Sequence, residues 1–480
     1  MSADTLLRAV AVLLAAGAGA AALAFPPRSF GDAGEYLLIT ESWFRHGSPA
    51  LRPADVSALR ELGAGRSPAV GVDAALGNYF EARDGRRYCY HFWAYSLLGV
   101  PARAALERLG GDPLRALPLT NAALLAGALA AVLLGLPWPP GRRLVLGGLL
   151  VLSPALGFLL WPHPETLSFA LVSLALVARE RGETGRAVLA AALASLQNPP
   201  LVVLVGFLWA GAAVPALRAG HLRPAGRATL GALPALAPPA FFLGWFGVAN
   251  LSVRPGEALE SLSALRAPDL LFDLNLGMVR FLPIALALFL GLAARELVRG
   301  RPGPGAPLTA VLLATAWACT ANSNWNNGTT GPSRYVAWLA PLVLFAVAHP
   351  ASALPGRQGR VLLLAAVVLQ GVVTIARGAF LSPYDYLEHS RPAQAVLERW
   401  PRLYAPAHEV FAERTLGHER GLEDLVVYRR DGRCRKALAR WRHGRELEEA
   451  CGPHPPARAA FFAGRPEGRD ARRAWVYVDY

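Results

Sequence analysis

Residues 30–40 read Phe30-Gly31-Asp32-Ala33-Gly34-Glu35-Tyr36-Leu37-Leu38-Ile39-Thr40 and directly follow the first apolar run of the chain. At helical spacing Asp32, Glu35 and Tyr36 are i, i+3 and i+4, so they share one face of a helix. A structural interpretation competes with a functional one, because Asp32 is a good N-cap and Glu35 completes a pattern that resembles a capping box. The position of this stretch relative to a membrane bears on the choice.

The composition predicts an all-α polytopic membrane protein. Of the 480 residues, 54% are hydrophobic and only 17% are charged, and the mean hydropathy is +0.32. A soluble protein of this length usually carries about 25% charged residues. The net charge of +14 comes almost wholly from arginine, with Lys436 the single lysine. No basic and aromatic groove pattern accompanies it, so we expect no nucleic-acid partner.

Eleven apolar runs are candidates for membrane spans. The first, 5–25, could also be a cleaved signal peptide, because small alanines precede two prolines; we expect an uncleaved span, since it approaches the roughly 20 residues needed to cross a bilayer. The run 187–197 is short, and Gln197-Asn198-Pro199-Pro200 after it predicts either a broken helix or a tight hairpin. The other runs are 117–136, 144–161, 165–178, 201–217, 228–249, 278–298, 306–321, 335–348 and 360–379.

The arginines indicate how the spans are oriented in the membrane. With a cytoplasmic N-terminus, every short loop assigned to the inside is basic, which agrees with the positive-inside rule. These loops carry Arg142, Arg143, Arg179, Arg181, Arg186, Arg218, Arg223, Arg227, Arg295, Arg299, Arg301, Arg357 and Arg360. We therefore expect a transmembrane domain, 1–380, with a large outer loop, 26–116, that contains amphipathic helices.

The tail, 381–480, is expected to form a small α+β domain outside the membrane. Its last residues, 474–480, look like a strand, and 435–450 looks like a helix. Cys434 and Cys451 flank that helix, and an oxidising compartment would allow them to form a disulfide. The alternative is two unpaired thiols.

With this topology, five polar clusters fall on the outer side. They are Asp32 to Tyr36; Tyr88 to Tyr95, which includes His91; Trp161 to Glu165, which includes His163; Asp269, Asp273 and Asn275; and Asn322 to Tyr335, which includes Arg334. Each has a structural alternative. His163 and Glu165 could simply start a helix, Arg334 could extend to lipid headgroups, Asp269 and Asp273 could be solvated loop residues, and the aromatic residues around His91 could form a membrane-interface belt.

In the order of these polar clusters and in their shared outer placement, the chain resembles the GT-C superfamily of integral-membrane glycosyltransferases. It is most similar to the bacterial branch of protein mannosyltransferases and aminoarabinose transferases. Gly31, Asp32, Tyr36 and Leu37 match that family's Gly-Asp-Glu-x-x-Tyr-Leu motif, although Ala33 stands where the second acid is usual. The segment 90–101 looks like its Tyr/His-rich helix, and 325–335 is similar to its late Gly-Pro-Arg-Tyr loop, with Ser333 inserted. Asp273 with Gly277 resembles a further motif of the family, Asp-x-x-x-Gly. The resemblance covers about 5–380.

The resemblance implies a polyprenyl-phosphate-linked sugar donor and an inverting transfer to an acceptor hydroxyl at the outer face of the membrane. Asp32 would be the general base, with Glu35 and His163 as further catalytic candidates. Arg334, Tyr335, His91, Tyr36 and Glu165 would bind the donor or its phosphate. A divalent metal is an open alternative. The expected location is the bacterial inner membrane, with the tail in the periplasm.

Two other classes compete with a transferase. A flippase or transporter of a lipid-linked glycan would share the many spans, but it would favour charged or broken helices at the membrane midplane. A catalytically inactive relative that acts in envelope assembly would explain the altered acidic pair. The sugar, the acceptor and the role of the tail do not follow from the sequence.

Overall fold

The structure is a computed structural model of the whole chain. It describes residues 2–66, 70–251, 262–264, 266–300, 303–322, 324–325, 331–352, 356–377, 385–419, 423–463 and 475–480. Residues 326–330 of the expected late loop, and the expected domain border at 380, lie outside the described residues. The chain divides into two compact units.

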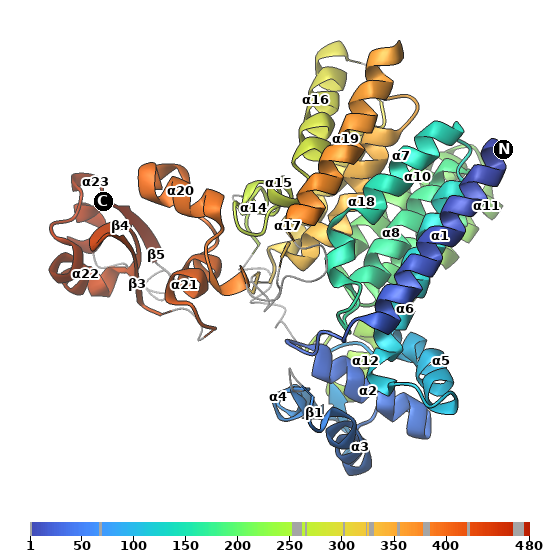
Figure 1. Cartoon of the computed structure of the whole chain (residues 1–480), viewed down its shortest axis with the longest axis horizontal. Coiled ribbons are helices and arrows are strands. Elements are labelled where there is room, and N and C mark those ends of the chain that lie inside the picture. Colours follow the sequence, from blue (N-terminus) through green and yellow to red (C-terminus); the bar gives the residue numbers. More distant parts are fainter. Residues whose placement is uncertain are drawn as a thin grey trace. The chain divides into compact units, whose positions relative to one another are not determined.

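The first unit comprises Met1–Ala267, Phe281–Asn322 and Arg334–Leu381, and it is built from helices (Figure 1). Its α-helices are α1 (Ala3–Ala24), α2 (Ala33–His46), α3 (Pro53–Gly63), α4 (Val72–Leu76), α5 (Ala94–Arg108), α6 (Ala116–Ala130), α7 (Pro140–Val151), α8 (Glu165–Glu180), α9 (Thr184–Ser195), α10 (Val202–Arg218), α11 (Leu222–Ala232), α12 (Ala237–Phe246), α16 (Pro283–Arg299), α17 (Gly305–Cys319), α18 (Arg334–Ala348) and α19 (Gly356–Ala376). Strands β1 (Tyr79–Glu81) and β2 (Arg87–Cys89) form an antiparallel hairpin between α4 and α5.

Every apolar run identified in the sequence contains helix. Five helical stretches are both long and apolar enough to cross a membrane: Ala3–Ala24, Pro113–Gly135, Pro199–Arg218, Leu222–Phe246 and Gln358–Ala376. Shorter apolar helices are Thr184–Ser195, Gly305–Cys319 and Arg334–Ala348. The chain is therefore mostly helical and has the character of a membrane protein, while the number of eleven spans stays a prediction.

The burial pattern separates the helices of the bundle into two kinds. In α18 every residue from Tyr335 to Ala348 is buried, as expected of an apolar helix at the centre of a bundle. In contrast, α1 and α19 expose large apolar side chains, among them Val12, Leu13, Val368 and Ile375. In water this much exposed apolar surface would drive aggregation, so these faces fit contact with lipid.

Helix α8 runs from the polar clusters to the arginine-rich turns and packs against α6, α9 and α18. Near its start, Leu167 packs in one apolar cluster with Leu37 of α2 and Tyr95 of α5. Helices α2 and α5 gather at one end of the bundle (Figure 1). At the last residue of α8, Glu180, Trp138 and His349 both bind the carboxylate. A helix of this length separates the two groups by roughly 24 Å. Helices α9 and α10 also pack together, which agrees with a hairpin at 197–200.

The second unit comprises Pro268–Arg280, Ser323–Ser333 and Ser382–Tyr480. Its sheet has the order β3 (Leu425–Arg430), β4 (Arg433–Arg440), β5 (Trp475–Asp479), and all neighbours are antiparallel. The helices are α14 (Asp269–Phe272), α15 (Met278–Phe281, which ends at the border of the unit), α20 (Arg391–Arg399), α21 (His408–Leu416), α22 (Gly444–Cys451) and α23 (Pro456–Ala463).

The prediction of a helix over 435–450 is wrong in its first half. Residues 433–440 form the central strand β4, a 3-10 turn covers 441–443, and the α-helix is confined to 444–451. The apolar residues Ala437, Leu438 and Ala439 are buried because β4 is covered on both faces and paired on both edges. A short apolar run of this kind does not distinguish a buried strand from a buried helix. The predicted terminal strand is confirmed as β5.

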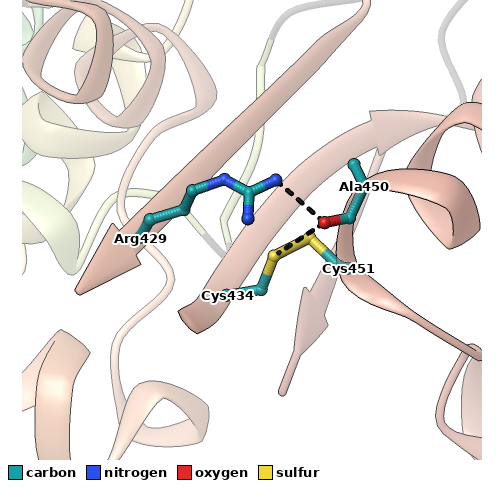
Figure 2. Close-up of a disulfide and its surroundings, with 4 residues drawn as sticks. All are labelled: Arg429, Cys434, Ala450 and Cys451. Carbon is teal, nitrogen blue, oxygen red and sulfur yellow. Dashed lines mark hydrogen bonds between the residues drawn. A yellow bond between two sulfur atoms is a disulfide. The ribbon is translucent and has the colours of Figure 1, made fainter. Parts of the chain in front are cut away.

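The predicted disulfide is confirmed and joins Cys434 of β4 to Cys451 at the end of α22 (Figure 2). Their Cα atoms lie 5.6 Å apart, which is an ordinary separation for a disulfide. The bond ties the helix to the central strand of a small sheet, and a unit of this size gains stability from such a link.

Candidate functional site

Asp32 occupies the N-cap position of α2, but its side chain makes no capping hydrogen bond. Gly31 before it has φ +56°, a left-handed conformation that glycine adopts without steric cost. Glu35 does not complete a capping box either, because its Oε1 accepts a hydrogen bond from Asn78 Nδ2 at 2.6 Å. The capping interpretation therefore does not account for how these two carboxylates are used.

The carboxylate of Asp32 instead meets three basic groups, all at Oδ2. His163 Nε2 and His91 Nε2 each lie 3.3 Å from this oxygen, and Arg334 Nη1 lies 3.4 Å from it. The side chain of Asp32 is still 29% exposed. Among the described residues, the ion-pair contacts of Asp32 all fall on Oδ2, which leaves Oδ1 as the oxygen that can receive a proton.

Backbone contacts bring Asp32 and His163 together although 131 residues separate them. Arg28 N donates to Leu160 O at 3.0 Å, and the Trp161 indole N–H donates to Phe30 O at 2.9 Å. These two bonds fix the segment that follows α1 against the turn that precedes α8. Asp32 is consequently positioned by main-chain geometry rather than by its own charge.

A buried asparagine holds the other side of this turn. Asn121 Nδ2 donates to Trp161 O at 2.8 Å, and Tyr95 Oη donates to Asn121 Oδ1 at 2.9 Å. The indole of Trp161 stacks on the His163 ring, with centroids 3.9 Å apart and planes at 11°. The imidazole is thus held in one orientation by packing and by hydrogen bonds in the surrounding layer.

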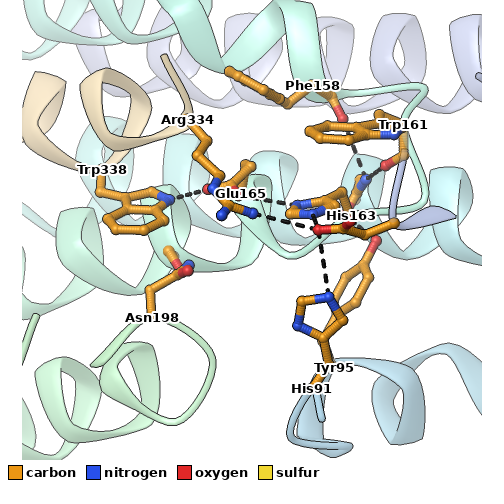
Figure 3. Close-up of polar contacts among 12 residues, drawn as sticks. His91, Tyr95, Phe158, Trp161, His163, Glu165, Asn198, Arg334 and Trp338 are labelled. Carbon is orange, nitrogen blue, oxygen red and sulfur yellow. Dashed lines mark hydrogen bonds and ion pairs between the residues drawn. The ribbon is translucent and has the colours of Figure 1, made fainter. Parts of the chain in front are cut away.

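Both ring nitrogens of His163 face carboxylates (Figure 3). Nε2 faces Asp32, and Nδ1 lies 2.9 Å from Glu165 Oε1. Only the imidazolium form has a donor at each nitrogen. Glu165 is itself fixed, because the Trp338 indole N–H donates to its other oxygen, Oε2.

Helix α18 supplies both Arg334 and Trp338, which are four residues apart and so share a face. Arg334 approaches Asp32, and Trp338 approaches Glu165. Tyr335 is buried, its ring centroid lies 5.6 Å from the guanidinium of Arg334, and it packs edge-on against Trp338. The start of this helix is therefore oriented toward the carboxylate cluster.

Tyr36 and His91 close the site on the side of α2. Their rings stack with centroids 4.7 Å apart, and Tyr36 also meets His163 edge-on at 5.0 Å. Burial and the charge of Asp32 hold the pKa of the Tyr36 phenol well above its ordinary value. Tyr36 remains neutral and contributes ring surface to the site.

The electrostatics of the cluster keep Asp32 ionised. Burial raises the pKa of the Asp32 carboxyl, but hydrogen bonds and charge from His163 and His91 outweigh this, so the pKa lies well below its ordinary value of 3.8. Burial lowers the pKa of His163, whereas Asp32 and Glu165 raise it, and the result lies above 6.5. The two shifts together favour a carboxylate beside an imidazolium.

Glu35 differs from Asp32. Burial, together with the charge of Asp32, raises the pKa of its carboxyl, and within the described part of the chain its Oε2 has no hydrogen-bond partner. Its bonded oxygen is directed to Asn78. Its catalytic role stays a prediction, and it would act more readily as a proton donor than as a base.

The expected cluster around Asp273 is held by contacts of its own. Asp273 belongs to the second unit, where its carboxylate accepts hydrogen bonds from the backbone of Asn275 and Leu276 and from Tyr404 Oη. These contacts form a turn and explain the burial of Asp273. Gly277 is required there, because a Cβ would lie 2.5 Å from the backbone of Asp273.

Two residues that hold the site were not identified from the sequence. Asn121 is the single amide in a run of apolar residues, and Trp338 lies one helical turn after Arg334. A polar side chain inside a membrane helix is costly and therefore signals a role. Either feature could have indicated them.

The site is a partly exposed carboxylate held by three basic side chains, with a second carboxylate behind one of them. Such a site can take a proton at Asp32 and bind an anion at Arg334. Across the described residues, no three His, Cys, Asp or Glu side chains are arranged to hold a metal ion. No family model, no curated protein and no solved structure matches the chain.

Proposed function

We propose that the protein is a glycosyltransferase that moves a sugar from a polyprenyl-phosphate-linked donor to an acceptor hydroxyl at the outer face of a bacterial inner membrane. One observation carries the proposal. Asp32, at the start of α2, does not cap its helix but meets His163, His91 and Arg334 through Oδ2 alone. The similarity of the surrounding motifs to GT-C glycosyltransferases supports the same function.

The proposed reaction is a single inverting displacement. The acceptor oxygen forms a bond to the anomeric carbon while the bond from that carbon to the donor phosphate oxygen breaks. The acceptor proton passes to Asp32 Oδ1, and the electron pair leaves with the polyprenyl phosphate. The lowered pKa of Asp32 keeps it ionised at neutral pH but makes it a weak base. A weak base suffices because transition states of this type carry oxocarbenium character.

Arg334 would bind the phosphate of the donor and stabilise the charge that develops as it leaves. When Arg334 turns to the phosphate, Asp32 loses the guanidinium from its surroundings, and its carboxylate becomes more basic. His163 would hold Asp32 in place, and Glu165 would hold His163 in the imidazolium form. Tyr36 and His91 would offer ring surface to the sugar.

The apolar outer helices support a lipid-bound donor. Helices α1 and α19 expose large aliphatic side chains, so an isoprenoid chain can remain in the hydrocarbon layer while its phosphate reaches the end of the bundle. A flippase would need its polar residues near the midplane of the membrane. In the first unit the Asp32 cluster instead lies at the start of α8, with the arginine-rich turns at its other end.

The experiment is a reconstitution in lipid nanodiscs with a panel of polyprenyl-phosphate sugars and crude envelope acceptors. We expect release of polyprenyl phosphate that depends on the acceptor, together with a glycosylated product. Movement of intact donor across a proteoliposome membrane without cleavage would overturn the proposal in favour of a transporter. Binding of donor with no cleavage for any sugar would favour an inactive relative.

A further inference from the structure

The second unit contains a cavity that the proposed transfer does not use. Its volume is about 350 Å³, which is in the lower part of the range of ligand pockets, about 300–1,000 Å³. It lies between α20, α21 and strand β3 and is lined by Glu388, His389, Gln394, Arg414, Thr415, Val427, Tyr428 and Arg429. Seven of these eight residues are polar or charged, so the cavity is suited to a hydrophilic ligand.

A β-bulge shapes one wall of the cavity. The register between β3 and β4 shifts between Tyr428 and Arg429. In a regular strand consecutive side chains point to opposite faces, so these two residues would not line the same space. A bulge redirects side chains in this way, and here it places an aromatic ring beside a guanidinium.

A chain of hydrogen bonds sets the proton positions of the opposite wall. Ser390 N donates to Asn275 Oδ1 at 2.8 Å, which fixes Asn275 Nδ2 as a donor toward His389 Nδ1, 3.4 Å away. Burial and the charge of Arg414 lower the pKa of His389 to about 3, so the imidazole is neutral and carries its proton on Nε2. That proton is donated to Thr415 Oγ1 at 3.0 Å.

Thr415 consequently keeps its own hydroxyl proton for another acceptor. Its hydroxyl has one donor and two acceptor positions, and the imidazole fills an acceptor position. Gln394 is oriented in a similar way, because its Nε2 donates to His389 O at 2.7 Å and its Oε1 is left as an acceptor. The wall therefore offers a hydroxyl donor beside an amide acceptor, which is a pattern that matches the hydroxyl groups of a sugar.

The charges of the lining favour an anion. Arg414 and Arg429 each carry a positive charge, and Glu388 carries the one formal negative charge in the lining. Arg414 is fixed by donating to Glu388 O at 2.6 Å, and Arg429 is fixed by donating to Ala450 O at 2.9 Å (Figure 2). The guanidinium of Arg429 has further N–H groups, and a guanidinium pairs well with a carboxylate.

We propose that this cavity binds one acidic monosaccharide unit, a uronate, with its carboxylate at Arg429 and its hydroxyls at Thr415 and Gln394. The face of the Tyr428 ring, which is half-buried, would cover the apolar face of the sugar. The unit would then act as a glycan-binding module. This binding does not depend on the transfer reaction proposed for Asp32.

The link from Cys434 to Cys451 supports the position of Arg429. Cys434 pairs with Arg429 across β3 and β4, and Ala450, which accepts the bond from Arg429, directly precedes Cys451. The disulfide thus holds the carbonyl that orients the guanidinium. Reduction of the full-length protein should weaken binding of the uronate without removing it.

The test is calorimetric titration of the full-length protein in nanodiscs with methyl glucuronide, methyl glucoside and inorganic phosphate as separate probes. We expect saturable binding of the glucuronide and at least tenfold weaker binding of the glucoside, because hydrogen bonds to charged groups contribute more than neutral ones. Phosphate that binds as well as the glucuronide would reduce the cavity to an anion site and overturn the proposal. Equal binding of both sugars would also overturn it.

Variants assign the binding to this cavity. Arg429→Ala should weaken glucuronide binding at least tenfold, whereas Arg430→Ala, whose side chain pairs with Glu398 and does not line the cavity, should leave it unchanged. Thr415→Val keeps the shape of the side chain and should weaken binding of both sugars about fivefold. Unaltered binding in Arg429→Ala, or loss of binding in Arg334→Ala of the first unit, would overturn the assignment.

Discussion

Replacing Glu165 by glutamine removes one negative charge from the site and little else. The amide oxygen can still accept the Trp338 indole N–H, and the amide nitrogen can donate to His163 Nδ1. A donor at that position favours the neutral imidazole over the imidazolium. Glu165→Gln should therefore lower the pKa of His163 while the fold is retained.

The structure sets the size of this effect. His163 Nδ1 and Glu165 Oε1 lie 2.9 Å apart, and the two side chains are 1% and 0% exposed. An opposite charge at such a distance moves a pKa by about 1–3, which corresponds to about 1.4–4 kcal/mol at 1.36 kcal/mol per unit. Loss of the charge should lower the pKa of His163 by that amount.

The assay is the pH dependence of kcat/KM for transfer from the polyprenyl-phosphate sugar. In the wild type, deprotonation of His163 turns a lone pair toward Asp32 and should reduce the rate on the alkaline side. In Glu165→Gln this alkaline limb should move to lower pH by about 1–3. The acidic limb, which belongs to Asp32, should move little.

The matched control is Glu180→Gln at the other end of α8. Glu180 also binds a tryptophan and a histidine, Trp138 and His349, but it lies far from Asp32. The pH profile of Glu180→Gln should equal that of the wild type. An alkaline limb that is identical in Glu165→Gln and in the wild type would refute the role assigned to His163.

The remaining predictions concern binding and stability. Arg334→Ala should weaken product inhibition by polyprenyl phosphate roughly tenfold to a hundredfold, since a hydrogen bond to a charged group contributes about 1.5–3 kcal/mol; a change below twofold would contradict it. The melting temperature should fall at both high and low pH. The stabilisation from His163 is complete below pH 6.5 and is lost as the pH rises through the raised pKa of its imidazole. The stabilisation from Asp32 is complete above pH 3.8 and is lost as the pH falls through the lowered pKa of its carboxyl. Scanning fluorimetry from pH 3 to 9 checks this, and a flat profile would count against it. Cys434→Ser should destabilise the second unit by about 3 kcal/mol in chemical denaturation, given a sequence separation of 17. Gly31→Ala should cost about 1–2 kcal/mol, because φ is +56° there, and should reduce transfer, whereas an unchanged melting temperature would argue against that backbone requirement.

The helices of the first unit could be predicted from the sequence because long apolar runs indicate membrane helices. It also predicted that 30–40, 161–165 and 334 would meet, from the side of the membrane on which arginine counting placed them. That reasoning could not supply the contacts that join them, because the bonds from Trp161 to Phe30 and from Asn121 to the turn before α8 are tertiary.

Two features of the chain misled or escaped sequence reasoning for physical reasons. Residues 435–450 contain alanine, leucine and arginine in a pattern that suits a helix, but pairing on both edges makes 433–440 a strand. Asp273, whose alternatives were a functional acid and an ordinary loop residue, accepts a hydrogen bond from Tyr404 Oη, a partner that the sequence pattern does not indicate. In both cases partners distant in the sequence decided the outcome, and a local pattern does not contain them.

Single-turnover transfer by Asp32→Asn measures whether Asp32 is the general base. The amide keeps the shape of the carboxylate but cannot take the acceptor proton, and general-base catalysis contributes about 10²–10⁴ in rate. We expect the rate to fall by at least about a hundredfold with donor binding retained, while Asp73→Asn, an exposed acid of the same outer segment, transfers at the wild-type rate. Transfer by Asp32→Asn within about twofold of the wild-type rate would exclude Asp32 as the general base.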